Sequence, residues 1–372
     1  MSPLAPMRVA IDARKLFDGG IGTYIRGLLA SLAREPRGDE YCALVDPRDA
    51  GRVAWPGPVA ERPVVAGKYG LAEHWVVPRE ARAAGATVLH APHYTLPLFW
   101  NGPSVVTIHD LIHLRFPQFH PPGAALYARV VAGAAVARAR VVLADSEFTR
   151  EDVIDLLGAR PDQVRVVYLA VPEGIAAPAP DAVAAFRSAR ALPAGYVLYV
   201  GARKRHKNLG LLLRAWAAMR EAERPPLVLS GAAWPADDPH ARLAGSLGVA
   251  KHVHFAGDAR DDAALSALYA GAALYAHPAL CEGFGLPPLE AMACGVPVLS
   301  SDAGSLAEVV GEAAQLLPPR DPAAWAHAIT SLLGSPTRRD NLVRRGHERV
   351  QRFSWTRTAE ATRAAYHAAL AG

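Results

Sequence analysis

The chain has 372 residues, enough for two ordinary domains with large buried cores. Hydrophobic residues make up 51% of it and charged residues 20%, which indicates a globular protein and excludes a disordered one. The formal net charge of +5 suits anionic substrates or an acidic membrane surface. Because this charge is small and no Lys/Arg-rich run of the kind that marks a nucleic-acid patch is present, we expect no nucleic-acid partner.

The cysteine content favours a reducing compartment. Cys42, Cys281 and Cys294 are odd in number and lack the spacing of metal ligands. The first residues, MSPLAPMRVAIDARK, contain no apolar signal core, and no stretch of 18 apolar residues follows. We therefore expect a cytoplasmic protein that does not span a membrane.

Apolar runs typical of strands alternate with helical patterns in both halves of the chain. The runs lie at residues 7–13, 86–92, 104–110, 140–146, 196–202, 226–232, 252–258, 273–279 and 295–301. Helical patterns, such as 21–34 and 208–222, separate them. This alternation predicts parallel sheets covered by helices on both faces.

The chain is expected to form two doubly wound domains. A segment rich in Pro and Ala begins near residue 171, and a helical pattern closes the chain after Trp355. We predict an N-terminal Rossmann-like domain at 1–172, a linker at 173–193, a C-terminal Rossmann-like domain at 194–355 and a C-terminal helix at 356–372. Ligands of such sheets bind beyond the carboxyl ends of the strands, so the expected site is a cleft between the domains.

Residues 281–301 read CEGFGLPPLEAMACGVPVLSS and place two carboxylates around a stiff segment. Pro287 and Pro288 cannot lie inside a helix, but they fit its first turn. We therefore expect Glu282 in a loop and Glu290 in the first turn of a helix that ends near Gly295. Such a helix start attracts anions, so the segment predicts a ligand that is negatively charged and rich in hydroxyls.

The loop DGGIGTY (18–24) follows the first expected strand and opens a helix. Its glycines would allow a phosphate or sugar to approach the backbone, and an ordinary tight turn explains them equally well. The third position of the dinucleotide fingerprint is Ile25, which argues against a nicotinamide site.

A basic segment, VGARKRHKNL (200–209), follows another expected strand, and Asn208 is predicted to cap the next helix. A diphosphate clamp is the favoured interpretation, and a solvated basic loop is the alternative. The cationic side chains are Arg203, Lys204, Arg205, His206 and Lys207.

His109 ends the expected strand SVVTIHD, where a structural role and a role in the cleft are equally plausible. Ser146 is predicted to cap a helix and is given no chemistry. The sequence contains no D-x-D triplet for a nucleotide-bound cation, no G-x-S-x-G and no P-loop motif.

The E-x7-E motif of Glu282 and Glu290 resembles that of the retaining glycosyltransferases of family 4, which have the GT-B fold. Further matching segments are IDARKLFDGGIGTYIRGLL, VVTIHDLIH, ADSEFTRED, LYVGARKRHKNL, HVHFAG and FSW. The resemblance extends from the first strand to residue 355, and the first third is similar to bacterial mannosyltransferases of polysaccharide assembly. It implies two Rossmann-like doubly wound α/β domains facing across a cleft, with a C-terminal helix that crosses back to the N-terminal domain.

The resemblance also implies roles for single residues in binding the donor. Glu290 would bind the ribose hydroxyls, and Glu282 the hydroxyls of the transferred sugar. Backbone amides would lie beside the sugar and the diphosphate, at Phe284, Gly285 and Leu286.

Lys207 matches a lysine that contacts the diphosphate. The arginine that usually accompanies it is replaced by Ala202 in one common pattern and by His206 in another, so Arg203, or else Arg205, is expected to act instead. In the N-terminal domain, His109 matches a histidine near the donor sugar, and Gly20 matches a glycine that lets the diphosphate approach.

These matches imply a retaining hexosyltransferase that needs no metal or other cofactor. The favoured donor is GDP-mannose, with UDP- and ADP-sugars as alternatives, and the acceptor is a hydroxyl of a glycan or a lipid-linked oligosaccharide. Loops at 55–80 and 92–101 would read the acceptor. The segment LPLFW (96–100) is either core or a peripheral contact with the inner face of the membrane. The competing classes are a GT-B nucleotide-sugar epimerase, an NAD-dependent oxidoreductase and a non-catalytic protein on the same fold.

Overall fold

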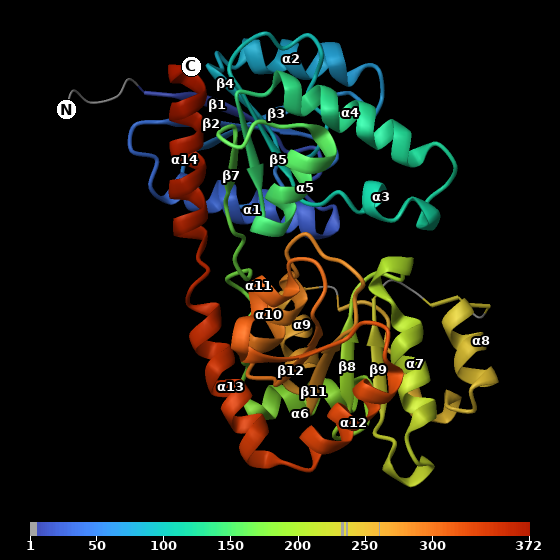
Figure 1. The fold of residues 1–372 in the computed structure, drawn as a ribbon. Helices are drawn as coiled ribbons and strands as arrows, with labels where there is room; N and C mark the ends of the chain where they lie inside the picture. The colour runs from blue at the N-terminus through green and yellow to red at the C-terminus, as the bar shows by residue number, and fades with distance from the viewer. Residues whose placement is uncertain (1–5, 232–233, 236, 260) are drawn as a thin grey trace. The chain divides into compact units, whose positions relative to one another are not determined.

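The structure is a computed structural model that describes residues 6–231, 234–235, 237–259 and 261–372. The chain divides into two compact units. The first combines the residues up to Ala170 with Phe353–Gly372, and the second is continuous from Val171 to Arg352. Each unit is a parallel β-sheet covered by helices on both faces (Figure 1), which confirms the predicted α/β class.

The sheet of the first unit has the strand order β3-β2-β1-β4-β5-β6-β7, with every neighbouring pair parallel. Its strands are β1 (Arg8–Asp12), β2 (Glu40–Val45), β3 (Val59–Pro63), β4 (Val88–Ala91), β5 (Ser104–Ile108), β6 (Val141–Ala144) and β7 (Val164–Val166). The order reverses at β1, which lies between β2 and β4. Ligands of doubly wound sheets bind at such a reversal, beyond the carboxyl ends of the strands.

The helices of the first unit include one that is remote in sequence. They are α1 (Gly19–Arg34), α2 (Glu73–Ala83), α3 (Ile112–Arg115), the 3₁₀ turn η1 (Pro117–Phe119), α4 (Ala124–Arg138), α5 (Glu147–Leu157) and α14 (Trp355–Ala371). Ser146 caps α5 as predicted, since its hydroxyl accepts a bond from the Thr149 amide.

The last helix, α14, is part of the core of the first unit. It packs on α1, where the buried Trp355 lies against Gly27. The hydroxyl of Tyr366 lies 2.8 Å from His90 Nδ1, and His90 Nε2 lies 2.8 Å from the hydroxyl of Thr107. Burial lowers the pKa of His90 to about 3, so this imidazole is neutral and can both donate and accept.

The second unit has the strand order β10-β9-β8-β11-β12-β13, again parallel throughout. Its strands are β8 (Val197–Val200), β9 (Leu227–Ser230), β10 (Val253–Phe255), β11 (Leu274–His277), β12 (Val298–Ser301) and β13 (Ala314–Leu317). The order reverses at β8, beside β11, and the residues that follow these two strands form the basic loop and the E-x7-E segment.

Helices cover both faces of the second sheet. They are α6 (Pro180–Ala189), η2 (Arg205–Lys207), α7 (Leu209–Ala218), η3 (Glu221–Glu223), α8 (Pro239–Ser246), η4 (Ala250–His252), α9 (Asp262–Ala270), α10 (Leu286–Ala293), α11 (Leu306–Val310), η5 (Gly311–Ala313), α12 (Pro322–Leu333) and α13 (Pro336–Val350). The segment 173–193, predicted as a linker, contains α6, which packs against α9.

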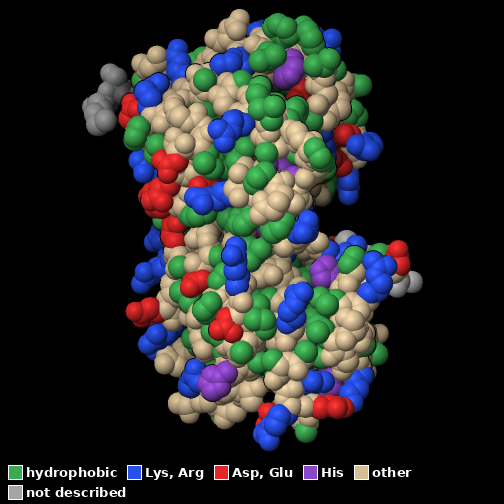
Figure 2. Space-filling view, turned by 45° about the vertical axis from the view of Figure 1, so that its right-hand side comes forward, with side chains coloured by type: hydrophobic (Ala, Val, Ile, Leu, Met, Phe, Trp, Pro, Cys, Tyr) green, Lys and Arg blue, Asp and Glu red, His purple; other side chains and the backbone are tan. Residues whose placement is uncertain are grey.

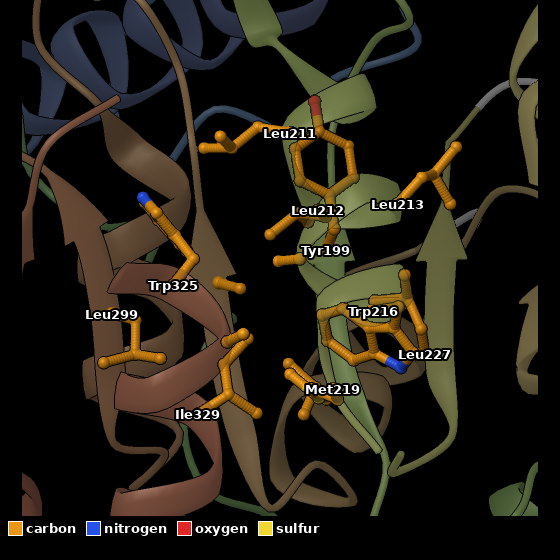
Figure 3. Close-up of a cluster of buried hydrophobic side chains, with 14 of the residues drawn as sticks. Tyr199, Leu211, Leu212, Leu213, Trp216, Met219, Leu227, Leu299, Trp325 and Ile329 are labelled. Atoms are coloured by element: carbon orange, nitrogen blue, oxygen red, sulfur yellow. The ribbon is translucent and has the colours of Figure 1, made fainter. Parts of the chain in front are cut away.

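Two tryptophans anchor the core between α7, α12 and the second sheet (Figure 3). Trp216 and Trp325 are fully buried, and each indole donates to a proline carbonyl, at 2.8 Å to Pro225 and 2.9 Å to Pro318. Each therefore adds a large apolar surface without leaving a polar atom unpaired.

Two details of the helical predictions are wrong. Asn208 does not cap α7 with its side chain; it adopts a left-handed conformation, and its amide donates to the carbonyls of Pro278 and Pro319. The helix also ends at Ala218, four residues earlier than the pattern 208–222 predicts, because Met219 is extended.

Replacing Gly27 by Ala should detach α14 from α1. A Cβ at this position would lie 2.3 Å from the buried Trp355 ring, so we expect the unfolding free energy to fall by about 1–3 kcal/mol. Urea unfolding followed by tryptophan fluorescence measures the effect. Gly133→Ala in α4 is the control: a Cβ there meets nothing within 4 Å among the described residues, so a gain of about 0.5–1 kcal/mol is expected.

Candidate active site

The Glu282 carboxylate lies in the loop after β11, as predicted, and is bound from two sides. Lys207 Nζ lies 2.5 Å from its Oε1, and His277 Nε2 lies 2.9 Å from the same oxygen. The side chain of Glu282 is only 10% exposed. Among the residues that the structure describes, Oε2 receives no bond, so one carboxylate oxygen is held and the other is available to a hydroxyl group.

These contacts keep Glu282 ionised. Burial alone would raise its pKa, but the Lys207 ammonium and the bond from His277 hold the pKa well below the usual range. Burial lowers the pKa of His277, which is therefore neutral. Its Nδ1 lies 3.0 Å from the Tyr275 hydroxyl, which can donate to it, so the imidazole proton resides on Nε2 and points at Glu282.

The loop from Glu282 to Gly285 is fixed by the segment that follows β12. The Ser305 hydroxyl lies 3.0 Å from the Glu282 carbonyl and 2.9 Å from the Phe284 carbonyl, and the Ser305 amide donates to Glu282. Gly304 lies so close that a Cβ would meet the backbone of Glu282 at 2.8 Å. The loop is therefore held by backbone contacts that other side chains would disturb.

Gly285 turns this loop into α10. Its φ of +98° lies in the left-handed region, and a Cβ would meet Leu306 at 2.7 Å, so both conformation and space favour glycine. The helix starts at Leu286, just before the two prolines. Of the first three residues of the helix, only Leu286 has an amide hydrogen, because the next two are prolines. The amides of Phe284 and Gly285 come directly before it in the chain.

Glu290 lies one turn deeper than predicted. The helix begins before the prolines, so Glu290 is its fifth residue and belongs to the second turn. Its carboxylate accepts a 2.8 Å bond from the buried Tyr269 hydroxyl. Burial raises the pKa of Glu290 to about 7, although the Tyr269 bond acts in the opposite direction. The two glutamates of the motif therefore differ in protonation near neutral pH.

Two cations of the basic loop have different partners: Lys207 contacts Glu282, whereas Arg203 is paired with Asp238. Arg203 Nε lies 3.3 Å from the buried carboxylate of Asp238, and its guanidinium lies over the Trp234 ring. Arg205 is exposed at the start of η2. The structure thus brings Lys207 and Glu282 into direct contact and pairs Arg203 with an acid that follows β9.

In the first unit, His109 follows β5 and binds on both ring nitrogens. Nδ1 lies 2.6 Å from Asp145 Oδ2, and Nε2 lies 3.0 Å from the Pro92 carbonyl. Both partners offer acceptor oxygens, so the ring is oriented by a contact at each nitrogen. Burial would lower the pKa of His109, but the Asp145 carboxylate outweighs it and raises the pKa.

Gly20 is the second residue of α1, and in the described part of the chain a Cβ there would meet nothing within 4 Å. Asp18, which precedes α1, does not cap it; its carboxylate binds Lys68 at 2.7 Å. The first-turn amides of α1, including that of Gly20, are therefore not covered by the Asp18 side chain.

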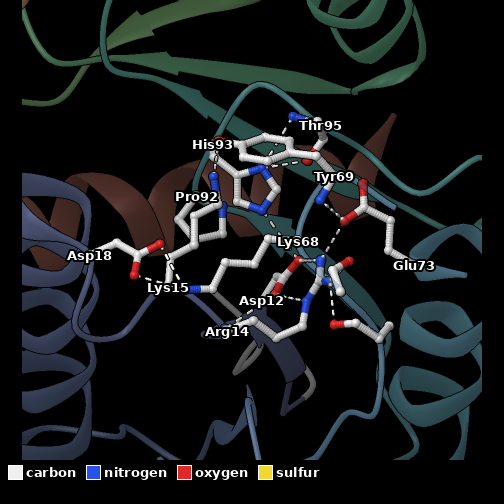
Figure 4. A network of polar contacts seen from close by, with 12 residues as sticks. Asp12, Arg14, Lys15, Asp18, Lys68, Tyr69, Glu73, Pro92, His93 and Thr95 are labelled. Atoms are coloured by element: carbon white, nitrogen blue, oxygen red, sulfur yellow. Dashed lines mark hydrogen bonds and ion pairs between the residues drawn. The ribbon is translucent and has the colours of Figure 1, made fainter. Parts of the chain in front are cut away.

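A second buried network lies at the carboxyl end of β1 (Figure 4). Arg14 binds both oxygens of Asp12, at 2.8 and 2.6 Å, and reaches Glu73 of α2 at 3.0 Å. His93, which follows β4, lies 3.3 Å from Asp12. This network fixes α2 to the reversal point of the first sheet.

Comparison with known proteins identifies the family. The model for Glycosyltransferase Family 4 matches residues 18–173, and that for Glycosyl transferases group 1 matches residues 185–349. The O-antigen chain mannosyltransferase B of Escherichia coli is 31% identical over 282 residues, which are 75% of this chain and 74% of the relative. The chain belongs to glycosyltransferase family 4.

Other relatives agree with this assignment. A D-inositol 3-phosphate glycosyltransferase of Kineococcus radiotolerans is 32% identical, covering 95% of this chain and 91% of its own. Sucrose-phosphate synthase from Thermosynechococcus elongatus superposes with a TM-score of 0.80 at 24% identity, covering 97% and 98% of the two chains. The fold is GT-B, and the enzyme is a hexosyltransferase.

The motif of this family 4 enzyme has partners that the sequence reasoning missed. Asp145, His277 and Tyr269 bind His109, Glu282 and Glu290 respectively. Asp145 and His277 stand at strand ends, which is a usable signal because the ends of neighbouring parallel strands lie together. Tyr269 lies inside α9, and nothing in its local sequence indicates the contact. Within the described residues, no three His, Cys, Asp or Glu side chains are grouped to hold a metal ion.

Replacing Glu290 by Gln should stabilise the unliganded protein at alkaline pH. The carboxyl has a pKa of about 7 when folded, above the ordinary value of 4.5, so its charge destabilises the fold above pH 7. This penalty disappears as the pH falls through 7 toward 4.5. We expect a gain of about 1–3 kcal/mol at pH 8 and almost none at pH 4.5, measured by urea unfolding. Equal stability of the two proteins at pH 8 would contradict the buried charge.

Replacing Lys207 by Met should destabilise the second unit by about 3–5 kcal/mol, because it leaves the Glu282 carboxylate buried without its ammonium partner. A double variant that adds Glu282→Gln removes the unpaired charge and should recover most of the loss. Urea unfolding of the single and double variants gives the coupling energy. Additive effects would show that the two side chains do not interact.

Proposed function

We propose that the enzyme is a retaining glycosyltransferase that moves a hexose, with mannose favoured, from a nucleotide-sugar to a hydroxyl of a glycan or lipid-linked acceptor, without a metal. The observation that supports this most directly is the buried Glu282 carboxylate, whose Oε1 is held by Lys207 and His277 while Oε2 is available. An ionised, oriented carboxylate beside a cation suits a ligand with both hydroxyl groups and negative charge.

The donor would bind along the E-x7-E segment in the second unit. Glu282 Oε2 would accept a bond from a hydroxyl of the transferred sugar, and Glu290 would accept bonds from the ribose. Between them, the diphosphate would meet the amides of Phe284, Gly285 and Leu286. Glu290 accepts two ribose bonds only when ionised, so donor affinity is expected to rise through pH 7.

Cations would stabilise the leaving group. Cleavage of the bond between the anomeric carbon and the phosphate oxygen leaves a nucleoside diphosphate with additional negative charge. Lys207 is aimed at this region, and Arg203 remains the preferred second cation, with Arg205 as the alternative. Removing one preorganised donor of this kind typically costs about 2.7–4 kcal/mol of transition-state stabilisation.

The acceptor hydroxyl would attack the face of the sugar from which the diphosphate departs, and its proton would pass to a leaving phosphate oxygen. This route retains the anomeric configuration and needs no carboxylate base, so Glu282 and Glu290 act in binding. For His109 and Gly20 of the first unit, we propose the roles that the sequence implies, toward the donor sugar and the diphosphate respectively.

Mannose is favoured because the E. coli relative is named a mannosyltransferase and shares 31% identity with this chain. GDP-mannose is the donor expected from the sequence. The alternatives are UDP- and ADP-sugars. Solved structures of Anabaena HepE contain UDP or UDP-glucose, but at 19% identity they bear only on the fold. Family membership disfavours the epimerase and the NAD-dependent oxidoreductase.

The acceptor would be read by the loops at 55–80 and 92–101 of the first unit. A lipid-linked acceptor would bring the enzyme to the inner face of the membrane as a peripheral protein. Of the segment LPLFW, Leu96 and Trp100 belong to the core, whereas Leu98 and Phe99 are exposed. In the described residues, no helix has the length and apolar character needed to cross a bilayer.

Thermal unfolding with GDP, UDP, ADP and NAD, each with and without EDTA, tests the donor. A nucleotide at a hundred times its dissociation constant adds about 2.7 kcal/mol to stability. We expect a shift with GDP that persists in EDTA, is lost in Glu290→Gln and is kept in the control Glu312→Gln, whose side chain is 92% exposed.

Turnover with GDP-mannose, followed by NMR of the product, tests the stereochemistry. The expected product is the α-anomer, as in the donor, and Lys207→Ala should lower kcat about 10²–10³-fold. Stabilisation by NAD alone would contradict the proposal, and so would a β-linked product.

A further inference from the structure

A groove of about 420 Å³ lies between α13 and η5 in the second unit, and most of its lining is charged. The charged residues are Arg344, Arg345, Glu348, Arg349 and Arg352, in or just after α13, and Glu312 of η5. Figure 2 shows charged side chains of both signs spread over the second unit, in the lower half of the view. A single arginine on such a surface needs no explanation, but four that line one hollow indicate a ligand of opposite charge.

Helical spacing brings these side chains to one side of α13. Arg345 and Arg349 are four positions apart, as are Arg344 and Glu348, and side chains at this spacing are neighbours on a helix. Gly346 lies on the other side, where it packs against Met292 of α10, since a Cβ there would lie 3.1 Å from the Met292 side chain. The helix therefore buries one side against α10 and presents the arginines away from it.

Arg349 is fixed in the groove by backbone contacts. Its Nε donates to the Val309 carbonyl at 2.7 Å, and its Nη2 donates to the Glu308 carbonyl, near the end of α11. Gly311 lies against the same guanidinium group, because a Cβ at this position would be 3.5 Å from its central carbon. A cation held in this way is ordered before a ligand arrives, so less side-chain entropy is lost on binding.

The acids of the groove are only weakly engaged. Glu312 lies 3.5 Å from Arg345, but its side chain is 92% exposed. Glu348 lies 2.6 Å from Arg344, and both side chains are more than half exposed. Ion pairs in such contact with water contribute little and can be exchanged for contacts with a ligand. Four arginines and two glutamates give the lining a net charge of +2.

The chemistry of the lining selects a small phosphorylated ligand. Guanidinium groups bind phosphate oxygens through two parallel hydrogen bonds, and a ligand with two or more negative charges would balance the net charge. The volume falls in the range of small-molecule sites, about 300–1,000 Å³. Apart from the charged residues, the lining consists of Gly311 and Ala313, so the groove lacks the large apolar side chains that a lipid surface requires.

We propose that the α13 groove binds the phosphate groups of a small, soluble phosphorylated compound. Arg349 contributes a fixed cation, while Arg344 and Arg345 exchange their exposed acid partners for the ligand. The site shares no residue with the E-x7-E segment or the basic loop, so it is separate from the donor site of the proposed function and does not depend on it.

Protection of arginines from phenylglyoxal tests the proposal on the unaltered enzyme, with inorganic pyrophosphate as the probe. At a pyrophosphate concentration ten times the dissociation constant, modification of Arg344 and Arg345 should slow about tenfold, because most grooves are then occupied. Mass spectrometry of the digested protein measures each arginine separately. Arg48 and Arg52 of the first unit are the internal control: each is paired with a nearby Asp outside the groove, and their modification should not change.

Calorimetric titration with pyrophosphate gives a second measurement. The variant Arg344→Gln/Arg345→Gln should weaken binding at the groove about tenfold or more, since two charge-assisted contacts are lost. The matched control Arg48→Gln/Arg52→Gln removes the same charge and should bind as the unaltered protein does. Pyrophosphate bound at the donor segment would be present in both variants, so it does not affect the comparison.

Equal modification of Arg344 and Arg345 with and without pyrophosphate would overturn the proposal. The same protection by sodium chloride at equal ionic strength would also overturn it, because general screening would then be the cause. Failure of every nucleotide to stabilise the enzyme would count against the proposed function and would leave the groove measurements unaffected.

Discussion

A carboxylate buried at the end of a parallel strand must be neutralised where it lies, and this constraint shapes both units of the enzyme. In the second unit, Lys207 neutralises Glu282, and the neutral His277 orients it. In the first, Arg14 neutralises Asp12, and His93 lies 3.3 Å from the same carboxylate. In each case one partner follows a different strand, since Lys207 follows β8 and His93 follows β4, so these contacts tie neighbouring loops together. The loops that carry the chemistry are consequently ordered before any ligand arrives.

The two acids of one short motif are held in opposite electrostatic states. Glu282 has a cation beside it and a low pKa, whereas the described residues supply Glu290 with the Tyr269 hydroxyl and no cation, and its pKa is about 7. Burial is similar for both, so the difference arises from the partner. A ligand with hydroxyl donors would stabilise the ionised form of Glu290, as Lys207 already does for Glu282. Binding of such a ligand would therefore be coupled to loss of the Glu290 proton.

The fold could be predicted because buried parallel strands are continuous apolar runs, as in 104–110 and 295–301. The edge strands β3, which reads VAERP, and β7, which reads VRV, lack that signal and were not predicted. The apolar strand β2 and the edge strand β13 were missed as well, whereas the edge strand β10 was predicted. The E-x7-E pattern identified both glutamates. The residue at which α10 begins could not be predicted, because it depends on the positive φ of Gly285 and on the close approach of Leu306, and no local sequence pattern encodes these. Asn208 was misassigned for the same reason, since its amide serves Pro278 and Pro319, distant in sequence.

The chain order of the two units has a consequence for biosynthesis. The second unit is continuous, from Val171 to Arg352, whereas the first is completed only by Phe353–Gly372. On the ribosome, the second unit can fold as soon as it has emerged. Until α14 is made, the first unit lacks Trp355, which packs against Gly27, and Tyr366, whose hydroxyl contacts His90. Domains usually fold in the order of synthesis. Here the N-terminal unit is finished last, because its closing helix α14 comes from the far end of the sequence.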